Sequence, residues 1–447
     1  SIYYYKEAVK VKPDYLIAYD NLGASLSATD KLEEAKKIYE KILELDANYK
    51  YIIGKLIFTK MMLYDWSNLD HGKNNLIELL NKKKRAINPF PLLSLIDNPE
   101  QHKNCAEIFV NDKYKDPEFK IKKYLKKKSD KIRIGYFSPD FRNHPMLFLM
   151  MDVFKYHDKS KFDIYAFSFG PEAKGEIYDT VKGFFTEFIN VRDISDMDLI
   201  KLSRDMKIDI AIDLCAYTAY NRASIFNSRL APIQINYLGY PGTMGANFID
   251  VIIADNIVIP EADKKNYTER VVNLPNCYQA CPKNLPMSDK KFGRRELGLP
   301  EDAVVFCNFN ANFKNTPDMF TAWTNIMKKV PNSVLWVMET KDEVGAINIL
   351  NEAEKRNINK NRIIFAESMD REFHLKRYEL ADLFLDSFPY NAHTTSSDAI
   401  RMGVPILTLK GKSFASRVSA SILNQVNMNE LVTNSIEEFQ EKAIALG

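Results

Sequence analysis

From Lys131 onward the sequence alternates short apolar, β-rich segments with amphipathic stretches, and this alternation restricts the possible folds more than any other feature. Strands that alternate with helices form a parallel sheet with helices on both faces. A first series ends near a Pro- and Lys-rich joint at 282–292, and a second begins at Val304. Two series predict two doubly wound sheets, with a ligand cleft at the carboxyl ends of the strands. The expected strands are residues 132–137, 162–167, 208–214, 233–237, 251–254, 304–306, 334–337, 363–365, 383–385 and 406–409.

Residues 1–50 carry an internal period that predicts paired helices. Ala8 and Ile42 lie 34 positions apart, and Pro13 and Ala47 repeat the same spacing at a turn. The pattern resembles a tetratricopeptide repeat, whose units stack because one unit cannot bury its own apolar face. We therefore expect the end of a longer array. It would serve either to dock protein partners or as a helical cap on the α/β domains.

The remaining domain boundaries are inferred from changes in pattern. Residues 51–128 are expected to be an irregular helical linker, in which Trp66 and residues 89–93 pack against the next domain along the chain. The lysine-rich run from Lys122 to Lys128 is most simply a solvated linker and marks a domain boundary. The predicted domains are the repeat at 1–50, the linker at 51–128, a first α/β lobe at 129–285 and a second α/β lobe at 286–447.

The composition is that of a globular protein without a strong preference for nucleic acid or membrane. The 447 residues carry a net charge of only +3, which gives no general attraction to nucleic acid. No apolar run reaches the ~20 residues that span a bilayer, and the first residues lack the layout of a signal peptide. The five scattered cysteines suit a reducing compartment, so we predict a cytoplasmic location.

The segment 390–398, Tyr-Asn-Ala-His-Thr-Thr-Ser-Ser-Asp, is the strongest candidate for a ligand site. It follows an apolar strand and precedes a short helical stretch that ends at Gly403. Such a turn leaves backbone N–H groups free, and the helix dipole adds positive potential. It therefore favours a bound anion such as a diphosphate, with His393 as a further donor. The alternative is that the Thr and Ser residues only cap the helix.

Further cationic side chains occur in the second half of the chain. Lys314 follows a predicted strand, where a point charge would neutralise a leaving diphosphate. Arg371, His374 and Arg377 are spaced by three residues and would share one helix face, suited to a nucleotide base, ribose or phosphate. A solvated basic helix is the alternative interpretation.

In the first half, polar loops follow the predicted strands. His144 lies after the first strand, where it could act as an acid, a base or a positioning group, although a lone loop histidine is more often structural. Gly239, Gly242 and Gly245 permit close approach of the backbone to a ligand. Their spacing is not the dinucleotide fingerprint, so we do not infer NAD.

No metal cofactor is expected. Asp196-Met-Asp198 lies at a predicted helix start, whereas a metal-dependent sugar transferase would hold its cation with carboxylates at a strand end. Cys277 and Cys281 have no second pair of ligands nearby, which argues against zinc.

Four motifs in this order are highly specific. They are residues 135–145, Pro232-Ile-Gln234 with Leu238-Gly-Tyr-Pro-Gly-Thr243, Asn391-Ala-His-Thr-Thr395 and Ala415-Ser-Arg-Val418. On these motifs the chain resembles the O-linked N-acetylglucosamine (O-GlcNAc) transferase family, bacterial and SPINDLY-related branches included, over nearly its whole length. The resemblance implies a GT-B fold of two Rossmann-like lobes. It also implies inverting, metal-independent transfer of N-acetylglucosamine from UDP-GlcNAc to Ser or Thr hydroxyls of protein acceptors.

The resemblance also assigns roles. The candidate catalytic residues are His144, Lys314 and Tyr217, and the identity of the general base is left open. Lys314, Thr394 and Thr395 would contact the diphosphate, with His393 beside the sugar phosphate. The candidate nucleotide-sugar-binding residues are Lys314, Met369, Arg371, His374, Arg377, His393, Thr394, Thr395, Asp398, Gly242 and Thr243.

Several positions depart from the family pattern, which leaves alternatives open. The departures are Phe148, Cys215, Ala216 and Ala311. A protein transferase that uses another nucleotide-sugar such as GDP-fucose is one alternative, although His393 and the 415–418 motif favour a UDP-sugar. A nucleotide-sugar epimerase and a non-catalytic repeat scaffold are the others. The repeat argues against the epimerase, and the retained Lys314, His393 and His144 argue against the scaffold.

Overall fold

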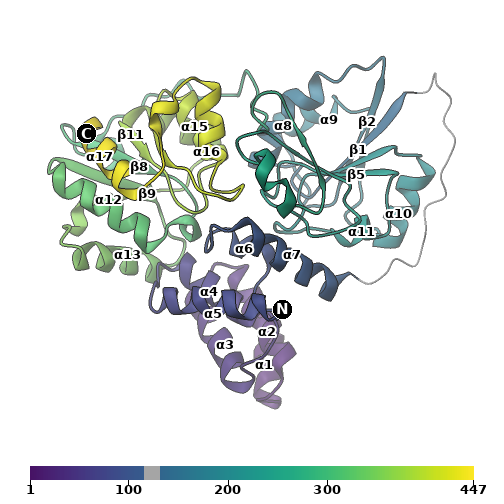
Figure 1. Ribbon diagram of the computed structural model, residues 1–447, viewed down its shortest axis with the longest axis horizontal. Coiled ribbons are helices and arrows are strands. Elements are labelled where there is room, and N and C mark those ends of the chain that lie inside the picture. The colour runs from purple at the N-terminus through teal and green to yellow at the C-terminus, as the bar shows by residue number, and fades with distance from the viewer. Residues whose placement is uncertain (115–130) are drawn as a thin grey trace. The chain divides into compact units, whose positions relative to one another are not determined.

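The computed structural model describes residues 1–114 and 131–447, which form two compact units (Figure 1). One unit, here called the helix–lobe unit, combines Ser1–Gln101 with Pro286–Gly447, and the other, the central unit, is His102–Leu285. The predicted boundary at Lys122–Lys128 lies outside the described residues. The domain boundaries drawn from the sequence stay a prediction. The packing places the helices before Gln101 in the same unit as the second α/β segment.

The central unit is built on a parallel sheet with strand order β3-β2-β1-β4-β5-β6-β7. The strands are β1 (Ile132–Ser138), β2 (Phe162–Ser168), β3 (Glu187–Asn190), β4 (Ile210–Asp213), β5 (Ile233–Asn236), β6 (Val251–Ala254) and β7 (Arg270–Asn273). Its helices are α7 (Pro99–Lys113, entering from the other unit), α8 (Pro145–Lys155), α9 (Glu176–Lys182), α10 (Asp196–Asp205), α11 (Ser224–Asn227) and the 3₁₀ turn η1 (Glu261–Asn266). Stacked rings of Phe137 and Phe167, 4.3 Å apart, join β1 to β2 in its core.

The helix–lobe unit contains the second parallel sheet, with strand order β10-β9-β8-β11-β12-β13. Its strands are β8 (Val304–Asn308), β9 (Ser333–Met338), β10 (Ile363–Ala366), β11 (Leu383–Leu385), β12 (Ile406–Leu409) and β13 (Val432–Thr433). The helices are α12 (Pro317–Lys329), α13 (Glu343–Lys355), α14 (Arg371–Arg377), α15 (Thr394–Arg401), α16 (Val418–Gln425) and α17 (Ile436–Leu446). The 3₁₀ turns are η2 (Arg295–Leu297), η3 (Asn312–Lys314), η4 (Lys360–Arg362), η5 (Tyr378–Leu380) and η6 (Asn429–Leu431). The prediction of two doubly wound parallel sheets is confirmed.

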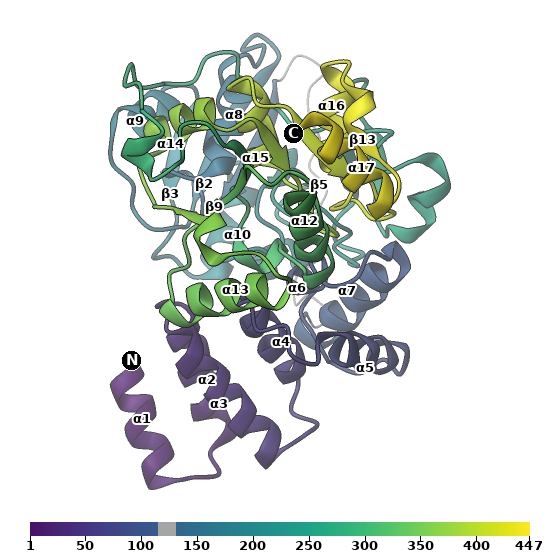
Figure 2. The ribbon, with the colours of Figure 1, turned by 90° about the vertical axis from the view of Figure 1, so that its left-hand side faces the viewer.

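Helices α1 (Ile2–Val11), α2 (Leu16–Ser27), α3 (Leu32–Leu45), α4 (Ile52–Met62), α5 (Leu69–Asn81) and α6 (Pro89–Leu92) form the helical segment of the helix–lobe unit (Figure 2). Its core contains Leu22, Tyr39, Ile42 and Ile52. Gly23 allows α2 and α3 to pack closely, since a Cβ at this position would lie 2.4 Å from the Tyr39 ring. The helix pairs agree with the expected repeat geometry. Within the described residues, no helix is both long enough and apolar enough to cross a membrane.

The helical segment packs against the lobe of its own unit. Trp66 lies 5.5 Å from Phe320, and Phe90 lies 5.7 Å from Phe313, as ring-centroid distances. The Asp342 carboxylate, which caps α13, also accepts hydrogen bonds from the first N–H groups of α3, at Leu32 and Glu33. Trp66 and Phe90 therefore pack against the second α/β segment, and not against the next domain along the chain as expected from the sequence.

Candidate functional site

A buried carboxylate organises the loop after β11 in the helix–lobe unit. Asp386 is 0% exposed, and burial raises its pKa. Its Oδ1 accepts hydrogen bonds from the N–H groups of Ser387 (2.8 Å) and Ala392 (2.7 Å), and its Oδ2 accepts one from Thr408 Oγ1 (2.7 Å). These bonds draw both ends of the loop 387–392 onto one side chain. These bonds therefore fix the position of the loop just before the start of α15.

Helix α15 begins at Thr394, earlier than the sequence suggested. The Thr and Ser residues expected to form a turn are the first turn of this helix, and His393 is its N-cap residue, without a side-chain capping bond. Two of their hydroxyls bind other groups: Thr395 Oγ1 donates to Asn310 Oδ1 (2.7 Å) and Ser396 Oγ to the Ala392 carbonyl (3.1 Å). The N–H groups of Thr394 and Thr395 have no carbonyl one turn back. The simple capping interpretation is thus wrong for this cluster, and the helix start keeps the geometry of an anion site.

Lys314 lies beside this helix start. Its Nζ donates to the Asn391 carbonyl (3.0 Å) and lies 4.0 Å from the centroid of the Tyr390 ring. Burial lowers the pKa of Lys314 to about 7, with Asp386 acting in the opposite sense. Burial and the Lys314 charge together hold the pKa of His393 well below its usual value, so His393 is neutral.

Helix α14 contributes two further pairs. Arg371 donates two hydrogen bonds to Asp398 on α15, at 3.1 and 2.7 Å. Arg377 is 1% exposed and its Nε donates to His374 Nδ1 (2.9 Å), so the solvated basic helix is excluded. Burial and the Arg377 and Arg371 charges lower the pKa of His374 to about 3. A neutral His374 that accepts at Nδ1 carries its proton on Nε2 and can donate there.

The candidate residues of the helix–lobe unit therefore gather at the carboxyl edge of its sheet. The Arg371–Asp398 pair joins α14 to α15. The first residues of α15, Thr394 and Thr395, follow His393, and Lys314 lies beside them. Met369 lies two residues before α14 and is half-buried.

In the central unit, His144 is the N-cap residue of α8. Its Nδ1 accepts a hydrogen bond from the Met146 N–H (3.2 Å) and lies 3.7 Å from Asp140 Oδ2. Burial lowers the pKa of His144, against the effect of Asp140. The neutral ring with Nδ1 as acceptor carries its proton on Nε2. His144 is thus arranged as a hydrogen-bond donor.

Tyr217, Gly242 and Thr243 meet at the loop 239–245 of the central unit. The Tyr217 hydroxyl donates to the Met244 carbonyl (2.6 Å), and Asn236 Nδ2 donates to the Gly242 carbonyl (3.2 Å). Gly239 is required by close approach, since a Cβ there would lie 2.1 Å from the Leu214 carbonyl oxygen.

Glu269 fixes the same loop and was not identified from the sequence. It is 4% exposed, and it accepts hydrogen bonds from Thr243 Oγ1 and the Met244 N–H, both at 2.6 Å. Burial raises the pKa of this carboxyl group. Both the Tyr217 and Thr243 hydroxyls are therefore committed to protein partners. Asp386 and Asn310 were missed in the same way, because a single polar residue near a strand end gives no periodic signal.

The chain is similar to several known sugar transferases. The profile of glycosyl transferase family 41 matches residues 100–284 and 279–447. The probable UDP-N-acetylglucosamine–peptide N-acetylglucosaminyltransferase SEC of Arabidopsis thaliana is 35% identical over 71% of this chain and 33% of that protein. The UDP-N-acetylglucosamine–peptide N-acetylglucosaminyltransferase of Caenorhabditis elegans is 24% identical over 86% of this chain and 44% of that protein. The chain thus spans less than half the length of these curated relatives.

The solved structure of a mutant of the Thermobaculum terrenum O-GlcNAc transferase covers 100% of this chain and 86% of its own, with a TM-score of 0.80 and 24% identity. That likeness shows a shared fold and confirms the expected GT-B class. Among the described residues, His, Cys, Asp and Glu side chains form no group of three that could hold a metal ion. The family profile covers both α/β segments, and together with the similarity to the Arabidopsis protein it shows that the chain belongs to glycosyl transferase family 41.

Proposed function

We propose that this chain transfers N-acetylglucosamine from UDP-GlcNAc to Ser or Thr hydroxyls of protein acceptors. Family membership and the activities for which the relatives are named support this reaction. The observation that carries it is the helix start at Thr394 with Lys314 beside it. Backbone donors, a helix dipole and a buried lysine converge there on a position suited to a diphosphate.

In the proposed complex the N–H groups of Thr394 and Thr395 bind the diphosphate, and Lys314 Nζ turns toward it from the Asn391 carbonyl. The Nε2–H of neutral His374 is a donor suited to a carbonyl of the uracil ring. Arg371 and Asp398 would position the nucleotide, with Asp398 near the ribose.

Lys314 and the helix dipole would stabilise the negative charge that develops on departing UDP, so the transfer is proposed to proceed without a metal ion. Inversion at the sugar is proposed from the family resemblance. The acceptor hydroxyl must lose a proton to a base as the new glycosidic bond forms. Neutral His144 carries its proton on Nε2 and could donate it to a sugar or acceptor oxygen. Tyr217 and Glu269 would hold the loop 239–245.

We expect UDP to bind in the presence of EDTA and to take up a proton at Lys314. In the protein without UDP, Lys314 has a pKa of about 7, and the negative charge of a bound diphosphate will raise this pKa. Binding should therefore weaken as pH rises above 7, with uptake near half a proton at pH 7 and approaching one proton at pH 8.5. Calorimetry in buffers of different ionisation enthalpy measures this uptake. The Lys314→Ala variant should bind UDP more weakly and without this proton uptake. Loss of binding in EDTA would contradict the metal-free proposal.

Intact-mass measurement of acceptor proteins, incubated with a panel of UDP- and GDP-sugars, tests the reaction itself. We expect the mass of one N-acetylhexosamine to be added from UDP-GlcNAc. Lys314→Ala should reduce the rate about 10²–10³-fold, as removal of one donor to a transition-state anion does. Addition of a deoxyhexose from GDP-fucose would instead support the fucosyl alternative. No addition from any sugar would reject the transferase.

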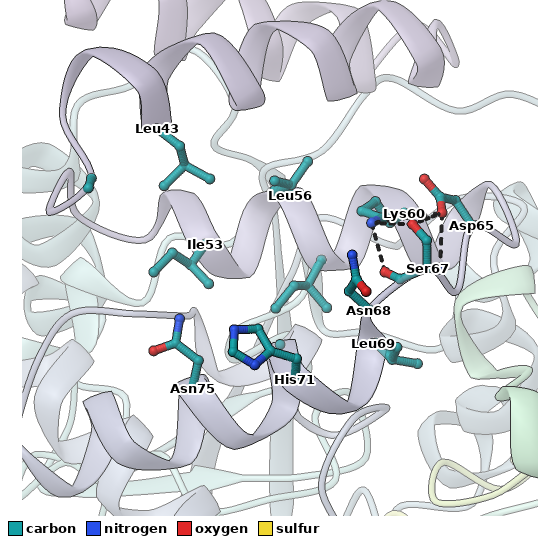
Figure 3. A pocket seen from close by; sticks show the side chains of 13 residues that line it. Leu43, Ile53, Leu56, Lys60, Asp65, Ser67, Asn68, Leu69, His71 and Asn75 are labelled. Atoms are coloured by element: carbon teal, nitrogen blue, oxygen red, sulfur yellow. Dashed lines mark hydrogen bonds and ion pairs between the residues drawn. The ribbon is translucent and has the colours of Figure 1, made fainter.

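Acceptor docking by the helical segment is part of the proposal. Helices α3, α4 and α5 line an open cavity of about 370 Å³ (Figure 3). Leu43, Ile53 and Leu56 line its apolar side, and Asn75 and His71 lie at its polar side (Figure 3). Apolar walls with a few polar groups suit an acceptor segment that carries both apolar and polar side chains.

A charge introduced into this cavity should weaken protein acceptors selectively. Asn75→Arg is expected to raise KM for a folded protein acceptor several-fold and to leave UDP affinity and transfer to a short peptide unchanged. Asn74→Arg is the matched control, because Asn74 is the exposed neighbour outside the cavity lining. Steady-state kinetics with both acceptors provides the measurement. Equal KM values for the two variants would remove this cavity from acceptor binding.

A further inference from the structure

We propose that Asp97 is a positioning residue for the donor turn, through which the helical segment holds the anion site in its binding conformation. The inference rests on the proposed UDP site at the start of α15. Asp97 lies in the connection between α6 and α7, far in sequence from residues 391–397.

The Asp97 carboxylate binds the loop 411–416, which follows β12. Its Oδ2 accepts from the Lys412 N–H (2.8 Å), and its Oδ1 accepts from the Ser413 N–H (2.8 Å) and from Ser416 Oγ (2.7 Å). Two backbone donors and a hydroxyl thus converge on one side chain. Ser413 and Ser416 are 0% exposed, so water would not easily replace the carboxylate.

The close fit depends on Gly411. A Cβ at this position would lie 2.4 Å from Asp97 Oδ2, 2.5 Å from Ser416 Oγ and 2.7 Å from the Phe388 ring. The Gly411 N–H donates to the Ser416 carbonyl (2.9 Å), which closes the loop around the carboxylate. The loop therefore has no room for a side chain at position 411 beside Asp97.

That loop in turn holds the donor turn. The Ala415 carbonyl accepts a hydrogen bond from the Asn391 N–H (3.0 Å), and the Ala415 backbone also hydrogen-bonds the His393 side chain. Asn391 is the residue whose carbonyl binds Lys314. Hydrogen bonds thus lead from Asp97 through residues 412–416 to Asn391, Lys314 and the start of α15. Removing the carboxylate frees the loop to take other conformations, and UDP then binds only the fraction of molecules with the turn in place.

The test compares Asp97→Ala and Asp97→Asn with Asp342→Ala in the full chain. Asp342 is a matched control, because it also accepts backbone N–H groups across the helical segment and the lobe, but at α3 and α13. We expect Asp97→Ala to weaken UDP binding about ten-fold, the loss that accompanies an unsatisfied buried donor. Asp97→Asn keeps one acceptor oxygen and should recover part of this loss. Asp342→Ala should lower the melting temperature without changing UDP affinity.

Hydrogen exchange of residues 391–397 supplies a readout that needs no ligand. The exchange should accelerate in Asp97→Ala and stay at the wild-type rate in Asp342→Ala. Unchanged exchange and unchanged UDP affinity in Asp97→Ala would overturn the proposal, as would equal effects of the two alanine variants. If the unmodified chain bound no UDP, the proposed function would fail. The exchange rates would still decide whether Asp97 holds the turn.

Discussion

The hydrogen bonds that Asp386 accepts at both ends of the loop 387–392 are the interaction on which the candidate donor site depends. A buried carboxylate without partners would be strongly unfavourable, and this one accepts hydrogen bonds from the Ser387 and Ala392 N–H groups and from Thr408 Oγ1, among other donors. The loop is thereby closed onto the end of β11, and α15 starts with its first N–H groups unused by the helix. Asp386 also lies near Lys314 and partly offsets the effect of burial on the lysine pKa. One side chain thus shapes the turn and supports the charge beside it.

The electrostatics of the helix–lobe unit favour an anion that the protein does not itself supply. Lys314 is buried, and its Nζ contacts the Asn391 carbonyl and the face of the Tyr390 ring. Within the described residues, Nζ has no hydrogen bond to a carboxylate. Its lowered pKa expresses the cost of keeping that charge away from water. A diphosphate at the start of α15 would offset this cost. The Arg371–Asp398 ion pair, by contrast, links α14 to α15.

The sequence was sufficient to predict the strands with continuous apolar residues and the residue types around the donor turn. It missed the edge strands β3, β7 and β13, because strands such as Glu187–Asn190 and Arg270–Asn273 carry charged or polar residues where a central strand would be apolar. It placed the start of α15 too late, since Thr and Ser are typical of caps and turns. It could not predict that the helical segment packs on the second α/β segment. Asp97 and Lys412 are 315 positions apart, and no local pattern reports such a contact.

A crystal structure of the chain with UDP tests the proposed donor site most directly. We expect diphosphate oxygens within hydrogen-bonding distance of the Thr394 and Thr395 N–H groups and of Lys314 Nζ, with the uracil ring beside His374. The Asp97 contacts to residues 412–416 should persist in the complex. UDP bound away from the start of α15, or a Lys314 that does not contact the diphosphate, would contradict the proposed site.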